Sequence, residues 1–164
     1  MNTIETRVCD ADLVELVYRE AELIDQGELE RWVELFAEDG MYWIPLAHDQ
    51  LDGLNSTSLL FEDKFLLRLR VERLKNPRAF SQHPVSHCLH VLQQPTVVSS
   101  SPAENEYRTR CKYVYIETRG DDQQVFGCTA LHTFALRDGE LKIVQKRIHL
   151  LNCDAPLRSI QLFM

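Results

Sequence analysis

Residues 36–45 constrain the fold of this chain most, because a helical pattern becomes a strand pattern there within a few residues. Just upstream, large apolar side chains share one face of a helix expected over residues 28–36. They are Leu29, Trp32, Val33 and Phe36. Asp39-Gly40 predicts the turn after this helix, since glycine readily takes a positive φ. An apolar and aromatic strand over residues 41–46 then begins a sheet.

Two further helices flank this corner of the chain. Residues 11–25 place an apolar stripe on one helical face, and Gly27 is suited to ending that helix. After a polar loop, residues 55–58 offer several N-caps for a third helix, which we expect to reach Lys75. That helix carries a cationic strip, which we interpret as a solvated face or as a contact for acidic groups of a partner. The strip consists of Arg68, Arg70 and Arg73.

From about residue 84 onward the period of the pattern changes to two. Residues 107–116 alternate in the manner of a half-buried strand. Further strands are expected over residues 85–92, 125–136 and 141–151. Asp138-Gly139 predicts a tight hairpin between the last two. Helices in the first half and strands in the second predict one α+β domain over residues 1–164, whose curved, mostly antiparallel sheet wraps round the long helix.

Charge and cysteine usage exclude several classes of function. The formal net charge of −7 argues against a nucleic-acid partner, because phosphate backbones are bound by clustered lysine and arginine. The 5 cysteines are odd in number and no two have C-x-x-C spacing, so neither a disulfide framework nor a zinc knuckle is indicated. The sequence lacks the patterns of a signal peptide and of a membrane span. We therefore expect a cytoplasmic protein with no membrane partner.

Three groups of residues carry a family resemblance by their order and spacing. They are Glu20-Ala21-x-Leu23-Ile24-Asp25, then Trp32-x-x-Leu35-Phe36-x-x-Asp39-Gly40-x-Tyr42-Trp43-x-Pro45, then Arg70-Val71-x-Arg73-Leu74 with Pro84-x-Ser86. The chain resembles, nearly end to end, the small β subunit of bacterial aromatic-ring-hydroxylating dioxygenases, with Tyr42-Trp43 most similar to the benzoate-type branch. One departure is that the family usually has arginine after Pro-x-Ser, where this chain has His87.

The resemblance implies an architecture and a set of partners. The fold would be a cone-shaped barrel of the nuclear transport factor 2-like, or cystatin-like, type. Three large and three small subunits would form a heterohexamer with a trimer of small subunits. The large subunit would carry the Rieske [2Fe-2S] cluster and the mononuclear non-haem iron, and a reductase or ferredoxin would deliver electrons from NAD(P)H. The small subunit would be structural, with no catalytic, cofactor-binding or metal-binding residue.

Three histidines form the strongest candidate metal site in the sequence itself. His83, His87 and His90 would share one face if their segment were helical, and three imidazoles could hold zinc or iron. We interpret residues 85–92 as a strand, in which His87 and His90 point to opposite faces. The sequence also lacks the paired Cys-x-His and Cys-x-x-His spacing of a Rieske ligand set. Ordinary loop, core or interface histidines are therefore expected.

An acid-base site inside the cone is the alternative that the residues leave open. The chain is similar to ketosteroid-isomerase-like proteins through the helix, the turn and the first strand. However, Ile44 occupies the position of the aspartate base of those enzymes, and Glu20 occupies the position of their tyrosine. The titratable groups that remain as candidates are Tyr18, Asp25, Asp39 and His132. The simpler interpretation is structural: Asp25 and Asp39 would stabilise a helix end and a turn, Tyr18 would flank a helix, and His132 would be a hydrogen-bonded residue of the sheet.

The sequence thus predicts a noncatalytic subunit that assembles and stabilises an aromatic-ring dioxygenase. The holoenzyme would add both atoms of O2 to an aromatic ring in the breakdown of aromatic compounds. The second hypothesis is a stand-alone cone-fold isomerase or dehydratase for a small cyclic metabolite. The third is a ligand-binding module without chemistry. The two other hypotheses differ from the first in needing an open interior.

Overall fold

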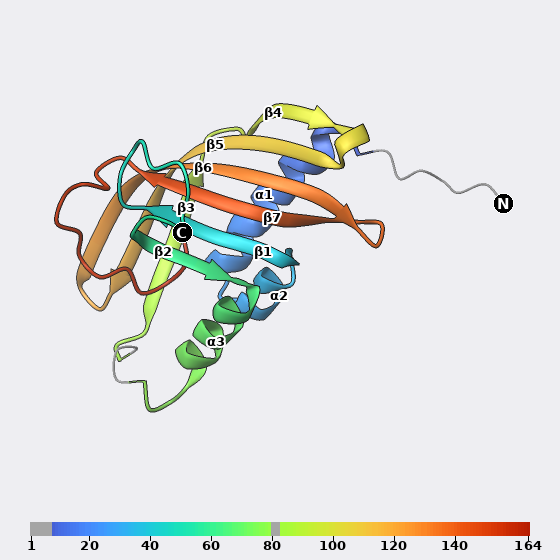
Figure 1. Cartoon of the computed structure of the whole chain (residues 1–164). Helices are drawn as coiled ribbons and strands as arrows, with labels where there is room; N and C mark the ends of the chain where they lie inside the picture. The colour runs from blue at the N-terminus through green and yellow to red at the C-terminus, as the bar shows by residue number, and fades with distance from the viewer. Residues whose placement is uncertain (1–7, 80–82) are drawn as a thin grey trace.

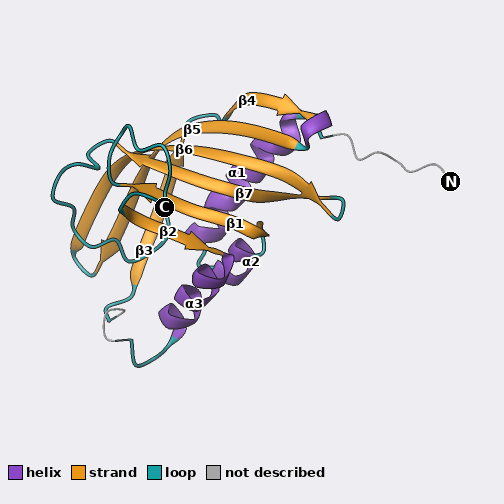
Figure 2. Ribbon diagram, in the orientation of Figure 1, coloured by secondary structure: helices purple, strands orange, loops and turns teal. Residues whose placement is uncertain are grey.

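The computed structural model describes residues 8–79 and 83–164, and one strongly curved sheet organises them. Its strand order is β2-β1-β7-β6-β5-β3, and β4 also pairs with β5 (Figures 1 and 2). The helices are α1 (Asp10–Asp25), α2 (Leu29–Val33) and α3 (Lys64–Lys75), with a 3-10 turn at Pro102–Glu104. The strands are β1 (Phe36–Pro45), β2 (Ser58–Asp63), β3 (Ser86–Leu92), β4 (Thr96–Ser101), β5 (Glu106–Arg119), β6 (Asp122–Arg137) and β7 (Glu140–Leu150).

The first helix forms as its sequence predicts. The Asp12 carboxylate accepts the backbone N–H of Cys9 at 2.8 Å, so the N-terminal turn is capped. The apolar stripe of α1 is buried against the sheet, which curves over the helix (Figure 1). Gly27 follows with a φ of 73°, a value that glycine takes without the clash a Cβ would cause.

The corner differs from the prediction, because α2 is shorter and β1 begins earlier than expected. The carbonyl of Leu35 accepts the N–H of Ile143 at 2.8 Å, and Phe36 pairs with Ile143 in the parallel ladder of β1 and β7. This ladder takes residues 36–40 into the sheet, so the helix expected over residues 28–36 is confirmed only over Leu29–Val33, and the turn expected at Asp39-Gly40 is wrong. Gly40 serves close packing instead: a Cβ there would lie 2.8 Å from the carbonyl oxygens of Ala37 and Ile143.

The third helix also begins later than predicted. Residues 58–63 form β2, which pairs antiparallel with β1, for example Phe61 with Trp43. The N-cap of α3 is Asp63, whose carboxylate accepts the N–H of Leu66 at 2.9 Å. The N-caps expected at Asn55, Ser56, Thr57 and Ser58 are therefore wrong. The reason is tertiary, since pairing with β1 satisfies the backbone of β2 along a strand.

The second half is the expected meander with longer strands and one addition. β5, β6 and β7 pair antiparallel in sequence order, and the β6–β7 turn has φ values of 52° at Asp138 and 81° at Gly139. The inward side chains of β5 are buried as the alternation predicts: Tyr107, Thr109, Cys111, Tyr113 and Tyr115. β4 was not anticipated. The α+β class with a curved, mostly antiparallel sheet round the N-terminal helices is confirmed.

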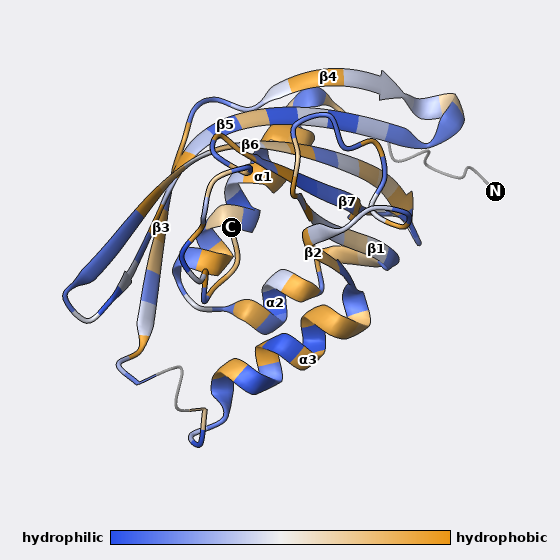
Figure 3. Ribbon diagram, turned by 60° about the vertical axis from the view of Figure 1, so that its left-hand side comes forward, coloured by the Kyte–Doolittle hydropathy of each residue, from blue (hydrophilic) through white to orange (hydrophobic). Residues whose placement is uncertain are grey.

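The apolar core lies between the inner face of the sheet and the three helices. Colouring by hydropathy shows apolar positions interspersed with polar ones along the helices (Figure 3), and the apolar positions of α1 at Leu13, Leu16, Val17 and Ile24 are buried in the core. The largest fully buried apolar side chains are Trp32, Tyr42, Tyr115, Phe36, Phe134 and Phe163. Among the described residues, no helix combines the length and the apolar character needed to cross a membrane. The core thus fills most of the space that the cone encloses.

Candidate functional site

Charged and polar side chains from four elements meet inside the cone, around Glu20 of α1. Glu20 Oε1 accepts hydrogen bonds from Lys146 Nζ on β7 at 2.5 Å and from Trp32 Nε1 on α2 at 2.7 Å. Glu20 Oε2 lies 3.3 Å from Nε2 of His132 on β6. Glu20, His132 and Lys146 are each only 2% exposed. We call these four residues the Glu20 cluster.

The electrostatics of the Glu20 cluster favour a fixed ion pair. Burial by itself raises the pKa of the Glu20 carboxyl. The Lys146 ammonium and His132 together lower this pKa by more than burial raises it, so it lies well below its usual range. Burial lowers the pKa of His132, although Glu20 opposes that shift. Neutral His132 can then donate from Nε2 to the Glu20 carboxylate. The Glu20 carboxyl is thus ionised near neutral pH, and both of its oxygens are occupied by groups of the protein.

The space beside the Glu20 cluster is too small for an organic substrate. A cavity of about 10 Å³ lies there, bordered also by His90, Cys111 and Tyr113. That volume is close to the minimum for one water molecule. Pockets for small organic ligands typically span about 300–1,000 Å³. The inner polar groups therefore contact each other and the core rather than an open chamber.

A second polar cluster joins the end of α1 to β3. Asp25 Oδ1 lies 2.6 Å from Nδ1 of His90, and Asp25 Oδ2 accepts the backbone N–H of His90 at 2.9 Å. The thiol of Cys88 lies 3.7 Å from Asp25 Oδ1, because residues 88 and 90 share one face of the strand. Burial, with the nearby Asp25 carboxylate, raises the pKa of Cys88 to about 12, so this thiol stays protonated. We call these three residues the Asp25 cluster.

The structure separates the three histidines that the sequence offered as a metal site. β3 is a strand, as predicted, so His87 is exposed on one face while the side chain of His90 is 2% exposed on the other. His83 is exposed ahead of the strand. Asp25, Cys88 and His90 are ligand types that zinc accepts. Both oxygens of Asp25 are, however, already engaged by His90.

The four acid-base candidates do not form one site. Tyr18 is 43% exposed, and Asp39 lies at the surface, 3.3 Å from Arg137. Asp25 belongs to the Asp25 cluster and His132 to the Glu20 cluster. The structure thus brings two of the candidates into the interior, each with a partner that the sequence did not pair with it.

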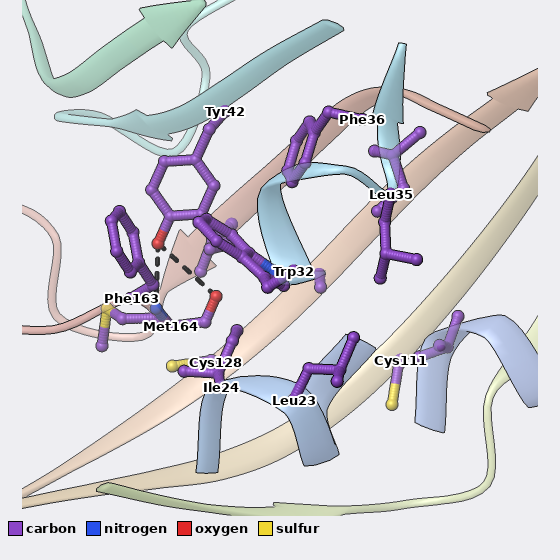
Figure 4. Close-up of a cluster of buried hydrophobic side chains, with 14 of the residues drawn as sticks. Leu23, Ile24, Trp32, Leu35, Phe36, Tyr42, Cys111, Cys128, Phe163 and Met164 are labelled. Atoms are coloured by element: carbon purple, nitrogen blue, oxygen red, sulfur yellow. Dashed lines mark hydrogen bonds between the residues drawn. The ribbon is translucent and has the colours of Figure 1, made fainter. Parts of the chain in front are cut away.

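The C-terminal segment packs into the apolar core. Phe163 and Met164 are fully buried. The Phe163 ring lies 4.4 Å from Trp32 and 6.0 Å from Tyr42, centroid to centroid. The Tyr42 hydroxyl accepts the N–H of Met164 at 2.9 Å and lies 3.4 Å from its carbonyl oxygen (Figure 4). Glu117 holds the preceding residues by accepting the backbone N–H groups of Gln161 and Leu162. The last residues of the chain are therefore part of the core, packed against α2 and β1.

The outer face of the sheet carries an exposed apolar surface, which we call the outer patch. It consists of Leu89, Val91, Val114, Val125 and Leu151, which are 40–79% exposed. Val91 pairs directly with Val114, and Leu89 and Val125 flank Ile116, so the patch runs continuously across β3, β5 and β6. Val91, Val114 and Leu151 of the patch also line a groove of about 600 Å³. Exposed apolar surface of this kind marks an interaction site.

Sequence reasoning named Glu20, His132, Asp25 and His90, but it missed Lys146 and the pairing of these residues in two clusters. Lys146 stands in register with the buried Ile148 and Leu150, so alternation along β7 could have identified it as an inward lysine. Glu20 lies one turn from Leu16 and Ile24 on the buried face of α1. A buried charge needs a partner, which is the signal that could have linked the two.

Comparison with known proteins places these features in a family. A family model described as "Ring hydroxylating beta subunit" matches residues 19–155. The small oxygenase component of the p-cumate 2,3-dioxygenase system of Pseudomonas putida is 29% identical over 145 residues, covering 87% of this chain and 79% of that protein. The matched range thus includes both clusters and all five outer-patch residues, as well as β1 and β2.

Two solved structures confirm the fold that the resemblance implies. The β subunit of benzoate 1,2-dioxygenase from Burkholderia mallei superposes with a TM-score of 0.74 at 21% identity, over 96% of this chain and 99% of that chain. A nuclear transport factor 2-like protein with a cystatin-like fold from Novosphingobium aromaticivorans gives a TM-score of 0.61 at 18% identity, over 87% and 81%. At such identities the superpositions establish the architecture alone.

Proposed function

The chain belongs to the ring-hydroxylating β-subunit family, and we propose that it serves as the noncatalytic, single-domain subunit that assembles and stabilises its dioxygenase. It is the small subunit of a multicomponent aromatic-ring-hydroxylating dioxygenase rather than a stand-alone isomerase or dehydratase. We place it in the cytoplasm, where its five free cysteines remain thiols.

One observation carries the noncatalytic assignment: the buried titratable groups of the Glu20 cluster border no space large enough for a substrate. The Glu20 cluster faces a cavity of about 10 Å³, and the buried Phe163 ring packs against Trp32 and Tyr42. A catalytic acid or base must reach its substrate within hydrogen-bond distance. The buried titratable groups of this chain instead contact one another, which suits a role in holding the fold.

The iron chemistry belongs to the partner in this proposal. A Rieske [2Fe-2S] cluster takes two cysteines and two histidines. Each group of clustered ligand types in the described chain, such as Asp25, Cys88 and His90, contains one cysteine and one histidine. These residues do not fit the cluster. We propose that the large α subunit holds both the Rieske cluster and the mononuclear non-haem iron, and that a reductase or ferredoxin delivers electrons to the holoenzyme.

The outer patch supports assembly into a larger complex. Apolar side chains at 40–79% exposure are costly to leave in water and gain free energy when another subunit covers them. We propose an α3β3 hexamer with a trimer of small subunits, in which this patch faces a neighbouring subunit. The negative formal net charge of the chain and the ion pairs on the surface outside the outer patch suit the regions that remain in contact with water.

Co-expression with the large subunit tests the proposal. Light scattering coupled to gel filtration is expected to give the mass of a hexamer, whereas a one-to-one dimer as the largest species would contradict this geometry. Val125→Asp, in the outer patch, should lower the yield of hexamer at least about tenfold, because a carboxylate would be buried without a partner. Val98→Asp is the matched control: Val98 is 60% exposed and Val125 59%, but Val98 lies on β4 outside the patch. Equal loss in both variants would count against the patch as an interface.

A further inference from the structure

A pocket of about 630 Å³ opens between β2, α3 and the C-terminal segment, and its walls differ sharply in character. One side is apolar, formed by Leu59 and Leu60 of β2, Leu74 of α3 and Ile160. These four side chains also pack against the hydrophobic core, so their positions are fixed. The volume lies in the usual range for small organic ligands. This pocket is separate from the Glu20 cluster, the Asp25 cluster and the outer patch.

The other side of the pocket is cationic. Arg70, Arg73, Arg78 and Arg158 line it, and no aspartate or glutamate does. This concentration of positive charge is notable in a chain whose formal net charge is −7. Guanidinium groups keep their charge at any physiological pH, so the pocket is a lasting site of attraction for an anion.

The four arginines are not equally available to a ligand. Arg70 is held by Glu62 at 2.5 Å and lies 5.5 Å from the centre of the Phe163 ring. Arg158 pairs with Asp122 at 2.9 Å. Across residues 8–79 and 83–164, Arg73 and Arg78 form no ion pair. Arg73 and Arg78 are therefore the side chains with free hydrogen-bond donors for a new partner.

We propose that this pocket binds a small organic monocarboxylate with an aromatic or branched apolar body. Arg73 and Arg78 would hold the carboxylate, because a guanidinium fork matches the two oxygens of that group. The wall of Leu59, Leu60 and Leu74 would take the apolar body out of water. An inorganic anion would leave that wall exposed, and a neutral ligand would leave the arginines unused. The two unpaired arginines and the apolar wall together therefore favour an anion that also has an apolar body.

Calorimetric titration of the full chain at low ionic strength tests the proposal, with benzoate as the probe. Saturable binding at one site per chain is expected. Benzamide, which has the same shape without the charge, and inorganic phosphate, which has charge without an apolar body, should each bind at least about tenfold more weakly. Equal binding of either compound, or no saturable binding of benzoate, would overturn the proposal.

Paired arginine variants locate the site. The double variant Arg73→Gln/Arg78→Gln should weaken benzoate binding at least about tenfold, and Leu60→Asn should weaken it without removing charge. Arg110→Gln is the control, since Arg110 is an exposed arginine of β5 that is remote from the pocket lining. An equal effect of the control would overturn the proposal. So would a double variant that binds benzoate normally but fails to assemble with the large subunit, since the arginines would then bind acidic groups of that subunit. Failure of benzoate binding leaves the assembly test above unaffected.

Discussion

Glu20 is the residue whose surroundings say most about the interior of this protein. Its carboxylate receives Lys146 and Trp32 at one oxygen and lies beside His132 at the other, all out of water. A buried charge is tolerated only when paired and hydrogen-bonded, and each partner here comes from a different element. The cluster therefore ties α1 to α2, β6 and β7 through one side chain.

Removing the cation of this pair should be strongly destabilising. Lys146→Met leaves the Glu20 carboxylate buried and uncompensated, which typically costs about 3–5 kcal/mol. Urea denaturation at pH 7 measures the loss. The double variant Glu20→Gln/Lys146→Met removes both charges and should recover part of it. A single variant as stable as the parent would show that the ion pair contributes little to folding.

His132 predicts how stability depends on pH. Its folded-state pKa is lowered by burial, so between that pKa and about 6.5 the unfolded chain binds a proton that the folded chain does not. The free energy of unfolding should therefore rise with pH up to about 6.5 and level off above it. Glu20, whose pKa is also lowered, adds stability that is present above about pH 4.5 and is lost on further acidification.

Denaturation curves measured between pH 4.5 and 7.5 check this dependence. His132→Gln should have a flatter profile between pH 5 and 6.5 than the parent. His87→Gln is the control, because His87 is exposed and should leave the slope unchanged. Identical slopes in the parent and His132→Gln would contradict the assignment of the pH dependence to this histidine.

At the scale of elements, β1 decides how the sheet continues beyond β7, through one parallel and one antiparallel ladder. Its parallel ladder with β7 begins at Phe36 and resumes at Met41 after an irregularity, and Gly40 lies within that irregular stretch. The glycine is needed for space rather than for a positive φ, since two backbone oxygens lie 2.8 Å from where its Cβ would be. Backbone atoms on both sides cannot move aside as a flexible side chain can.

Gly40→Ala should consequently destabilise the protein by about 1–3 kcal/mol, the usual cost of overpacking a well-packed site. Gly127→Ala is a matched control on β6, where the new Cβ would meet only the side chain of Leu151 at 3.5 Å. That variant should stay within about 0.5 kcal/mol of the parent. Thermal or urea unfolding of the two variants gives the comparison, and equal stabilities would mean that β1 adjusts to the methyl group.

At the scale of the whole molecule, the lack of substrate-sized space beside the Glu20 cluster predicts a subunit whose polar residues matter for folding and not for turnover. In the assembled dioxygenase, Tyr18→Phe, Asp25→Asn and His132→Gln should leave turnover per assembled iron within a small factor of the parent. Trp32→Ala should lower the yield of assembled enzyme, because truncating a buried tryptophan costs about 3–5 kcal/mol.

Turnover normalised to iron content separates the two effects. A general acid or base contributes about two to four orders of magnitude to rate. A loss of that size in fully assembled Asp25→Asn or His132→Gln enzyme would assign chemistry to the small subunit and end the noncatalytic proposal.

The sequence by itself determined the features that depend on neighbours along the chain. The apolar stripe of α1, the alternation of β5 and the Asp138-Gly139 turn all follow from residues close in sequence. The spacing of the motifs around Trp32 and Tyr42 also identified the family. Local periodicity and turn chemistry carry this information, because side-chain direction repeats with the period of the backbone.

Only the tertiary structure decided the features whose partners are distant. Residues 58–63 became a strand because β1 pairs with them, and residues 36–40 joined the sheet because β7 does. Glu20 met Lys146 across 126 positions, and Asp25 met His90 across 65. Pairing partners and compensating charges are set by which elements pack together, and a buried backbone or charged group takes whichever partner the packing brings within reach.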